Sequence, residues 1–382
     1  MTSIESVHAD HGATFDERGR RTVVSHYGRP DRAHRAVRNG VGLIEPAYGI
    51  VTVAGDDRVE YVDNVVTNDV PTTDGTGRYA LLLDPQGRIE TDLYVYDAGD
   101  RLLCVTPPGR AGPLAEEWAE KVFIQDVEID HATDEFAIFG VHGPQATEKV
   151  ASVLGGSATP DEPLTFVRGT IADAGVTVTR TDGLAGEEGY EVVCAVEHAE
   201  SVYEALSVTG MGAAPFGYRT WESLTLEAGT PLFETELEGT IPNVLGLRNA
   251  LDFEKGCYVG QEVVSRVENR GQPSRRLIGL VVSASDTPDP SDSTADEQDI
   301  ADERPVPEVG AAVFDGDTAV GAVTRAAVSP SLDRTVALAL VEYDLDVTDL
   351  TVRVDGSERP AERRPLPLVE GSASSARRPT YP

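Results

Sequence analysis

Residues 78–106 read RYALLLDPQGRIETDLYVYDAGDRLLCVT, and this stretch alternates apolar runs with turn residues. The runs at 78–83, 89–96 and 101–106 are rich in aliphatic and aromatic side chains, and Asp, Pro and Gly residues separate them. Such runs predict strands joined by tight turns. Together with a similar run at 49–54, they predict an antiparallel sheet.

Two neighbouring segments carry apolar residues at helical spacing instead. They are 58–66 and 110–121, and they combine with the strands into an α+β domain. Strand patterns return at 136–141 and 175–196, and a helical pattern follows at 198–206. The middle of the chain therefore predicts a second α+β unit.

After about residue 275 the chain shows strand and turn patterns only. The strand-like runs are 277–282, 310–314, 319–325 and 336–343. They predict a small, closing β-barrel at the C-terminal end. Residues 283–308 interrupt it with Asp, Ser, Thr and Pro, and we expect an acidic, disordered insertion there because so few apolar residues cannot offset the entropy of ordering. The Pro-, Arg- and Ser-rich end, 357–382, is expected to be a mobile tail.

These patterns predict three domains and a tail. The first α+β domain would occupy 1–145, the second 146–270, and the barrel 271–356, with the tail after it. A chain of 382 residues with 40% hydrophobic content is long enough for two or three domains with cores of their own.

The chain is strongly acidic. It has 65 acidic and 32 basic residues, a net charge of −33, and only three of its basic residues are lysines. Such a surface is typical of salt-adapted proteins. It also argues against nucleic acid as a main partner, because non-specific affinity for phosphate backbones depends on clusters of Lys and Arg.

The sequence contains neither a membrane segment nor a cysteine framework. Residues 1–21 lack the apolar core of a secretory signal, and no run of eighteen apolar residues occurs, so we expect a cytoplasmic protein. The three cysteines, Cys104, Cys194 and Cys257, form no Cys-x-x-Cys pair. They predict neither a disulfide framework nor a self-contained metal site.

Residues 255–262, KGCYVGQE, place a thiol beside one of the rare lysines and ahead of a helical pattern that ends near Gly271. A helix N-terminus and the Lys255 ammonium would favour the thiolate of Cys257, which is the nucleophilic and metal-ligating form. The alternative is a glycine turn in which a small cysteine simply packs.

Two carboxylates on predicted strands, Asp92 and Glu191, would by themselves be ordinary surface residues. A series of short motifs around them, in chain order, resembles the folate-binding superfamily that contains the glycine-cleavage T-protein (aminomethyltransferase) and the YgfZ family. The motifs lie at 67–70, 78–84, 87–95, 142–146, 186–191, 226–229, 320–324 and 329–332.

The resemblance implies three domains around a central cavity that holds tetrahydrofolate. By match to the family motifs, Glu191 would accept the paired N–H and amino donors of the pterin, an arrangement that one carboxylate can satisfy with both oxygens. Asp92 would lie near the nitrogen of folate that carries the one-carbon unit, and Tyr79 would lie against the pterin. The arginine that T-proteins carry ahead of the 226–229 motif is Trp221 here.

The octapeptide at 255–262 is similar to the hallmark of the YgfZ-type branch. The resemblance implies a tetrahydrofolate-binding protein that supports iron–sulfur cluster assembly or repair through Cys257, with Lys255 tuning the thiol and with client or assembly proteins as partners. The alternative is an aminomethyltransferase that delivers a one-carbon unit to tetrahydrofolate, in which Asp92 is the catalytic residue. A third alternative is a folate-binding protein without turnover.

Overall fold

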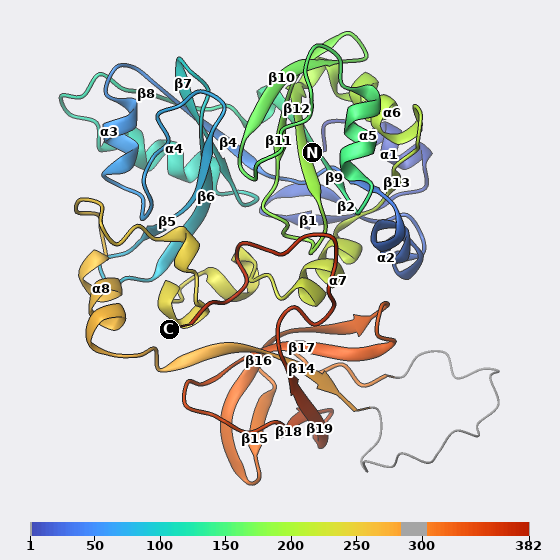
Figure 1. Cartoon of the computed structure of the whole chain (residues 1–382), viewed down its shortest axis with the longest axis vertical. Coiled ribbons are helices and arrows are strands. Elements are labelled where there is room, and N and C mark those ends of the chain that lie inside the picture. The colour runs from blue at the N-terminus through green and yellow to red at the C-terminus, as the bar shows by residue number, and fades with distance from the viewer. Residues whose placement is uncertain (1, 284–303, 382) are drawn as a thin grey trace.

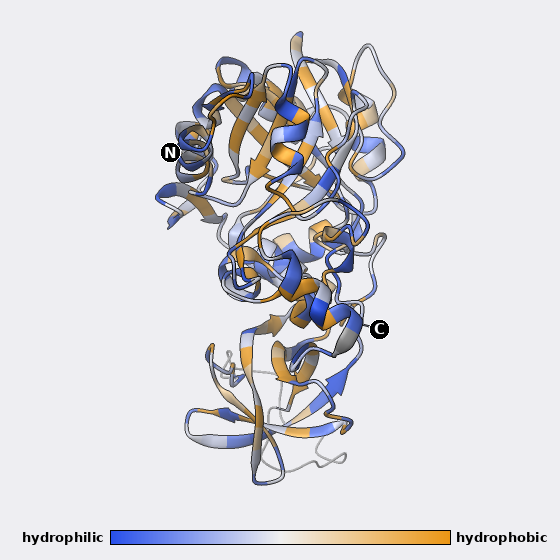
Figure 2. Ribbon diagram, turned by 90° about the vertical axis from the view of Figure 1, so that its left-hand side faces the viewer, coloured by the Kyte–Doolittle hydropathy of each residue, from blue (hydrophilic) through white to orange (hydrophobic). Residues whose placement is uncertain are grey.

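The computed structural model describes residues 2–283 and 304–381, in three lobes (Figure 1). Two β-sheets lie side by side at one end of the elongated molecule, and a barrel forms the other end. Figure 2 shows apolar residues on the strands of these lobes and in the region between them. Most of the insertion expected at 283–308 lies outside the described residues. In the part of the chain that is described, no helix is long and apolar enough to cross a membrane.

The first sheet is the antiparallel sheet that residues 78–106 predict. Its five strands, in spatial order, are β5 (Gly77–Leu83), β6 (Ile89–Asp97), β7 (Arg101–Thr106), β4 (Gly49–Ala54) and β8 (Glu128–His131). Helices α3 (Arg58–Asp63) and α4 (Ala111–Glu120) belong to this lobe, and Trp118 of α4 is one of its fully buried side chains. The predicted strands and helices here are confirmed, although α3 is shorter than the 58–66 expected.

The second sheet has six strands and combines segments from both sides of residue 145. Their spatial order is β10 (Phe166–Ile171), β11 (Ala174–Arg180), β12 (Gly189–Ala195), β9 (Phe136–His142), β3 (Gly42–Ile44) and β13 (Ala214–Pro215). Helices of this lobe are α1 (Glu5–Asp10), α5 (Ala146–Val153) and α6 (Ala199–Val208). Because β3 and β9 pair with each other and β9 pairs with β12, the first two lobes interleave along the chain.

The C-terminal strands close into the predicted barrel. Around it run β14 (Arg275–Val282), β17 (Arg334–Glu342), β16 (Thr318–Ser329), β15 (Ala312–Asp315), β18 (Asp349–Val354) and β19 (Ser357–Arg364). Its interior is lined with small and branched residues such as Val313, Ala337 and Val341, all of which are fully buried.

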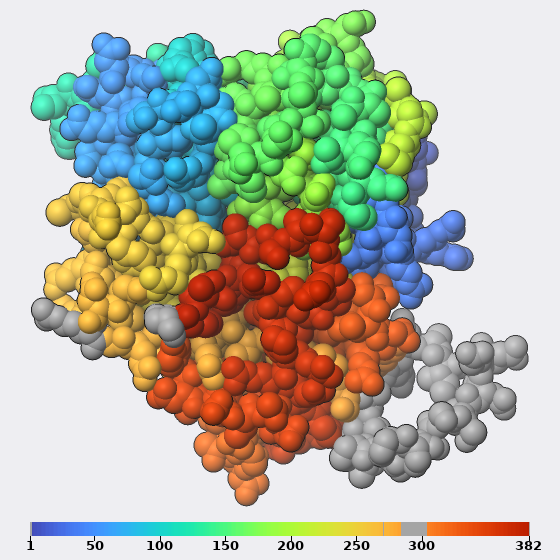
Figure 3. All heavy atoms as spheres, viewed as in Figure 1, coloured from blue at the N-terminus to red at the C-terminus, as the bar shows by residue number. Residues whose placement is uncertain are grey.

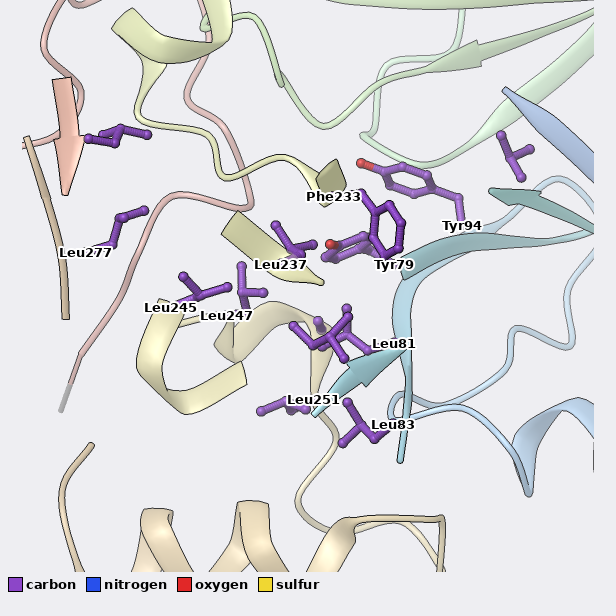
Figure 4. Packing of buried hydrophobic residues seen from close by; sticks show 14 of the residues in the cluster. Tyr79, Leu81, Leu83, Tyr94, Phe233, Leu237, Leu245, Leu247, Leu251 and Leu277 are labelled. Atoms are coloured by element: carbon purple, nitrogen blue, oxygen red, sulfur yellow. The ribbon is translucent and has the colours of Figure 1, made fainter. Parts of the chain in front are cut away.

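Shorter elements complete the fold, and several of them connect the three lobes. They are the hairpin β1 (Thr14–Arg18) and β2 (Arg21–His26), the helices α2 (Pro30–Asn39), α7 (Tyr218–Ala228) and α8 (Gln261–Arg270), and the short helical turns Thr133–Glu135, Val196–His198, Phe233–Leu237, Pro242–Leu245 and Arg248–Ala250. Helix α7 contacts α2, β2 and the barrel strand β16. In Figure 4, Leu247 and Leu251, on either side of the last turn, lie near Leu81 and Leu83 of β5. This packing fixes the first sheet to the connecting segment, residues 218–270.

The expectation of a mobile tail after residue 357 is wrong. Strand β19 pairs with both β14 and β18, and these ladders close the barrel. The chain then continues across the middle of the molecule to Tyr381, whose hydroxyl donates to Val244 O at 2.8 Å. Composition alone suggested disorder because the residues that fix this segment are distant in sequence.

Candidate functional site

A cavity lies where the two sheets meet the connecting segment and the barrel. Its walls surround about 930 Å³ of space that no atoms fill, a figure that includes open solvent. Each lobe contributes to its wall: Asp92 comes from β6, Glu191 from β12 and Arg325 from β16, while Trp221 lies on α7. The C-terminal segment adds Arg377.

Asp92 is 2% exposed and its two carboxylate oxygens have different surroundings. Oδ2 accepts a hydrogen bond from the Tyr79 hydroxyl at 3.2 Å and lies 2.7 Å from Nη1 of Arg377. Oδ1 is buried without a hydrogen-bond partner among the described residues. Since buried polar atoms are normally paired, the free oxygen marks a place where a ligand atom can bind.

Glu191 lies across the cavity from the first sheet, on β12. Burial and the nearby charge of Asp182 raise the pKa of Glu191 to about 7, and the Arg377 guanidinium opposes the rise. Burial likewise raises the pKa of Asp182, whose carboxylate accepts the Tyr94 hydroxyl at 2.9 and 3.0 Å. At neutral pH, Glu191 is therefore poised between its neutral and ionised forms.

Two tyrosines and an arginine form one layer of the site. The rings of Tyr79 and Tyr94 have centroids 5.0 Å apart (Figure 4), and the Arg377 guanidinium carbon lies 4.2 and 5.1 Å from these two centroids. Arg377 also donates to the Tyr94 hydroxyl from Nε and Nη2, at 3.2 and 2.9 Å. Cation–π contacts and charge-assisted hydrogen bonds thus hold the arginine in one orientation.

His142, at the end of β9, is a neutral group in the cavity wall. Burial lowers its pKa to about 4, and its Nδ1 has no hydrogen-bond partner within the described chain. Its ring centroid lies 5.1 Å from that of Trp221. The imidazole therefore adds a neutral ring to the cavity wall beside Trp221, with Nδ1 against the backbone of Gly189.

Cys257 and Lys255 lie outside the cavity wall. Cys257 is exposed, and helix α8 begins four residues later, at Gln261. The loop ends at Gly260, whose φ of 81° and close approach to Asp84 O favour glycine.

The Lys255 ammonium is bound by oxygens of the first lobe. It donates to Asp63 O and Asn68 O at 2.7 Å, to Val66 O at 3.1 Å, and to Asp63 Oδ1 at 3.0 Å. None of the hydrogen bonds and ion pairs of Lys255 with the described residues involves Cys257. The lysine fixes the loop to the end of α3, and its predicted influence on the thiol stays a prediction.

The structure places Asp92, Tyr79 and Glu191 in one region, while their predicted contacts with folate stay predictions, and it adds residues that the sequence did not single out. These are Arg377, Asp182, Tyr94 and His142. His142 and Asp182 stand in or near the matched motifs at 142–146 and 186–191, so their positions carried a signal. Arg377 stands in a segment without apolar periodicity, and only the fold shows where it lies.

Comparison with known proteins agrees with this architecture. Residues 4–255 match the family model described as GCVT N-terminal domain, and residues 298–370 match that of the glycine cleavage T-protein C-terminal barrel domain. The chain is 29% identical to an aminomethyltransferase of Streptomyces coelicolor over 97% of both chains, and 30% identical to one of Bacillus pumilus over 81% of both. The fold is similar to that of glycine cleavage system aminomethyltransferase T from Bartonella henselae, with a TM-score of 0.82 and 22% identity over 97% of this chain and 98% of that one.

Proposed function

Because the chain belongs to the glycine cleavage T-protein family of folate-binding proteins, we propose that it binds tetrahydrofolate in the central cavity and transfers a one-carbon unit there, as an aminomethyltransferase. The observation that carries this proposal is the buried pair of acceptors, Asp92 Oδ1 and the Glu191 carboxylate, on opposite sheets of one cavity.

The residues present fit such a ligand. A pterin carries an N–H beside an amino group, and the Glu191 carboxylate has no hydrogen bond to other described residues, so both of its oxygens are available to this donor pair. The aromatic side chains of Tyr48, Tyr94 and Phe233 line the same space and provide flat apolar faces for the rings.

Asp92 is the residue proposed to act on the reacting nitrogen. When bound, tetrahydrofolate supplies a nucleophilic nitrogen that takes up the one-carbon unit. The free Oδ1 can accept the proton of that nitrogen while Oδ2 stays bound to Tyr79 and Arg377, so Asp92 serves as a positioned general base. Asp92 is 2% exposed, so bulk water has little access to the carboxylate itself.

Calorimetry in molar salt tests the binding part of the proposal. We expect the wild type to bind tetrahydrofolate and Glu191→Gln to bind it more weakly by about 1.5–3 kcal/mol, the usual contribution of a hydrogen bond to a charged group. The matched control is Glu197→Gln, an exposed glutamate beyond the end of β12. Equal affinities of wild type and Glu191→Gln would remove Glu191 from the site.

The transfer itself is tested with an aminomethylated carrier. When the carbon of a thiol-linked aminomethyl group passes to tetrahydrofolate, its C–S and C–N bonds break and two bonds to folate nitrogens form. The two protons lost from those nitrogens leave with the carrier thiol and with ammonia, so we expect ammonia release that depends on both carrier and folate. If no thiol-linked aminomethyl carrier gives ammonia while folate binding is intact, the protein binds folate but is not an aminomethyltransferase.

Cys257 supports a second function, the maintenance of iron–sulfur enzymes predicted from the 255–262 motif. Its thiol is exposed, while those of Cys104 and Cys194 are buried, so it is the accessible thiol of the three. The family matches and the relatives above do not single out the YgfZ-type branch. Cells carrying Cys257→Ser should lose iron–sulfur enzyme activity under oxidative stress while glycine breakdown continues; the reverse pattern would remove this role.

A further inference from the structure

Residues 365–381 run from the barrel across the face of the molecule, between the second sheet and the connecting segment (Figures 1 and 3). Main-chain hydrogen bonds attach this C-terminal strap to three separate regions. The donor–acceptor pairs include Leu368 N to Glu227 O (2.8 Å), Ala373 N to Gly186 O (3.3 Å), Ala376 N to Asp182 O (3.0 Å) and Thr380 N to Gly246 O (3.0 Å).

The strap also packs tightly against the Gly186 turn. A Cβ on Gly371 would lie 1.9 Å from Gly186 O, which leaves no room for a side chain. Next to it, the Ser372 amide donates to Glu187 Oε2 at 2.9 Å, and Glu187 is itself paired with Arg38 at 2.7 Å. The strap therefore has a defined position, and so does the side chain that it carries into the cavity.

Arg377 differs from the other arginines of the cavity wall. Arg18 pairs with Glu222 and Glu234, and Arg325 lies 3.5 Å from Glu236, so both are engaged with glutamates of the connecting segment. Arg377 pairs with Asp92 instead, and it is only 6% exposed.

The contacts of Arg377 decide which oxygen of Asp92 remains free. The guanidinium and the Tyr79 hydroxyl both occupy Oδ2, and Oδ1 is left buried and unpaired. We infer that the C-terminal strap is a working part of the site, in which Arg377 is a positioning residue that holds Asp92 with Oδ1 presented to the ligand. The inference rests on the proposed function.

The charges support the same assignment. Asp92, Asp182 and Glu191 are three buried carboxylates, and buried carboxylates without a cation are costly. The Arg377 guanidinium offsets part of this cost, since it opposes the rise in pKa that burial imposes on Asp182 and Glu191. Arg377 comes from the C-terminal end of the chain and lines the same cavity as Asp92 and Glu191.

Replacement of Arg377 tests the inference through the split between kcat and KM. In Arg377→Ala, Asp92 is free to rotate, so we expect kcat of aminomethyl transfer to fall roughly ten- to a hundredfold, as misplacement of a reacting group does, with a smaller change in KM for tetrahydrofolate. Millimolar guanidinium ion should restore much of the lost kcat, and urea, which is flat but neutral, should not.

Two further variants keep the result interpretable. Arg378→Ala removes the neighbouring arginine, which does not line the cavity, and should behave as wild type. Arg377→Lys keeps the charge if the alanine variant fails to fold, and we expect an intermediate kcat because an ammonium cannot reproduce the planar fork.

Three outcomes would overturn the inference. Unchanged kcat in Arg377→Ala would show that the strap lines the cavity but does not position Asp92. A loss that guanidinium does not restore, accompanied by a lower melting temperature, would show a purely structural arginine. If the wild type binds no tetrahydrofolate, the proposed function fails and the inference falls with it, an outcome distinct from failure of the arginine variants alone.

Discussion

The central cavity and the Lys255–Cys257 loop differ in the burial and the hydrogen bonding of their reactive groups. In the cavity, charged groups from distant parts of the chain, Asp92, Glu191 and Arg377, are buried together and two acceptors stay unpaired. In the loop, the lysine next to Cys257 has its ammonium bound by four oxygens of the first lobe, and the thiol is exposed.

The difference shows that neighbours in sequence need not act together. Lys255 and Cys257 are two residues apart, yet the lysine contributes to anchoring the loop. Asp92 and Arg377 are 285 positions apart and form a close ion pair of 2.7 Å. These contacts favour chemistry in the cavity and leave the exposed thiol of Cys257 for encounters with other molecules.

The largest effect is expected from Asp92→Asn. An amide of the same shape cannot take up a proton, so the rate of transfer should fall roughly 10²- to 10⁴-fold, the usual range for loss of a general base. Folate affinity should change much less, because the amide oxygen can still accept a hydrogen bond. Steady-state kinetics and calorimetry on the same preparation separate the two effects.

Asp100→Asn is the matched control, since this aspartate is exposed in the turn after β6. If Asp92→Asn transferred the one-carbon unit at the wild-type rate, Asp92 would not be the general base. That result would place the chemistry outside the cavity and direct attention to Cys257.

The first sheet could be predicted because residues close together in the sequence specify its strands and turns. In 78–106, short apolar runs separated by turn residues such as Asp-Pro-Gln-Gly specify strands and turns within a few residues, and β5 to β7 follow the predicted ranges closely. Asp92, Glu191 and Tyr79 came from motif order in the family, and the fold places them together.

The C-terminal strap could not be predicted because residues distant in the sequence hold it in place. Residues 365–381 lack a repeating apolar pattern, and their order comes from partners such as Asp182, Gly246 and Glu227, which only the folded chain brings near. The contacts of Lys255 were hidden for the same reason: a long side chain can reach acceptors on another lobe, and adjacency in sequence does not reveal them.

A smaller effect on the cavity is expected from pH. The pKa of Glu191 in the folded protein is about 7, above the ordinary 4.5, so binding that needs the carboxylate should strengthen as pH rises. If the ligand requires the ionised form, affinity for tetrahydrofolate should increase roughly tenfold between about pH 6 and about pH 8. Glu191→Gln should show no such slope, and an equal slope in this variant would assign the titration to another group.

Stability without ligand should change in the opposite direction over the same range. A carboxyl whose folded pKa is raised contributes stability that is fully present below its unfolded value, near 4.5, and is lost as pH rises through about 7. At about pH 8 the unliganded Glu191→Gln variant should therefore melt higher than the wild type. Lower melting at this pH would mean that the carboxylate has a stabilising partner in solution.

Lys255→Met should affect stability but barely affect the cavity. The substitution leaves the carbonyl oxygens of Asp63, Val66 and Asn68 without their ammonium, so the free energy of unfolding should fall by about 1.5–3 kcal/mol. Lys121→Met is the control, since this lysine is 59% exposed and forms an ion pair with the exposed Glu117. Thermal melts measure the loss. A marked loss of folate affinity in the folded Lys255→Met protein would show that the loop and the cavity communicate.

The smallest effect on the cavity is expected from Cys257 itself. Cys104 and Cys194 are 0% and 2% exposed, so a maleimide should label one thiol quickly in the native protein and all three only after unfolding. Cys257→Ser should abolish the fast labelling and change stability by no more than about 0.5 kcal/mol, as for other surface substitutions. Folate affinity and transfer rate should be those of the wild type, both in this variant and in the labelled protein. If labelling of Cys257 instead blocks folate binding, the Lys255–Cys257 loop affects the cavity. The two regions would then not be independent in solution.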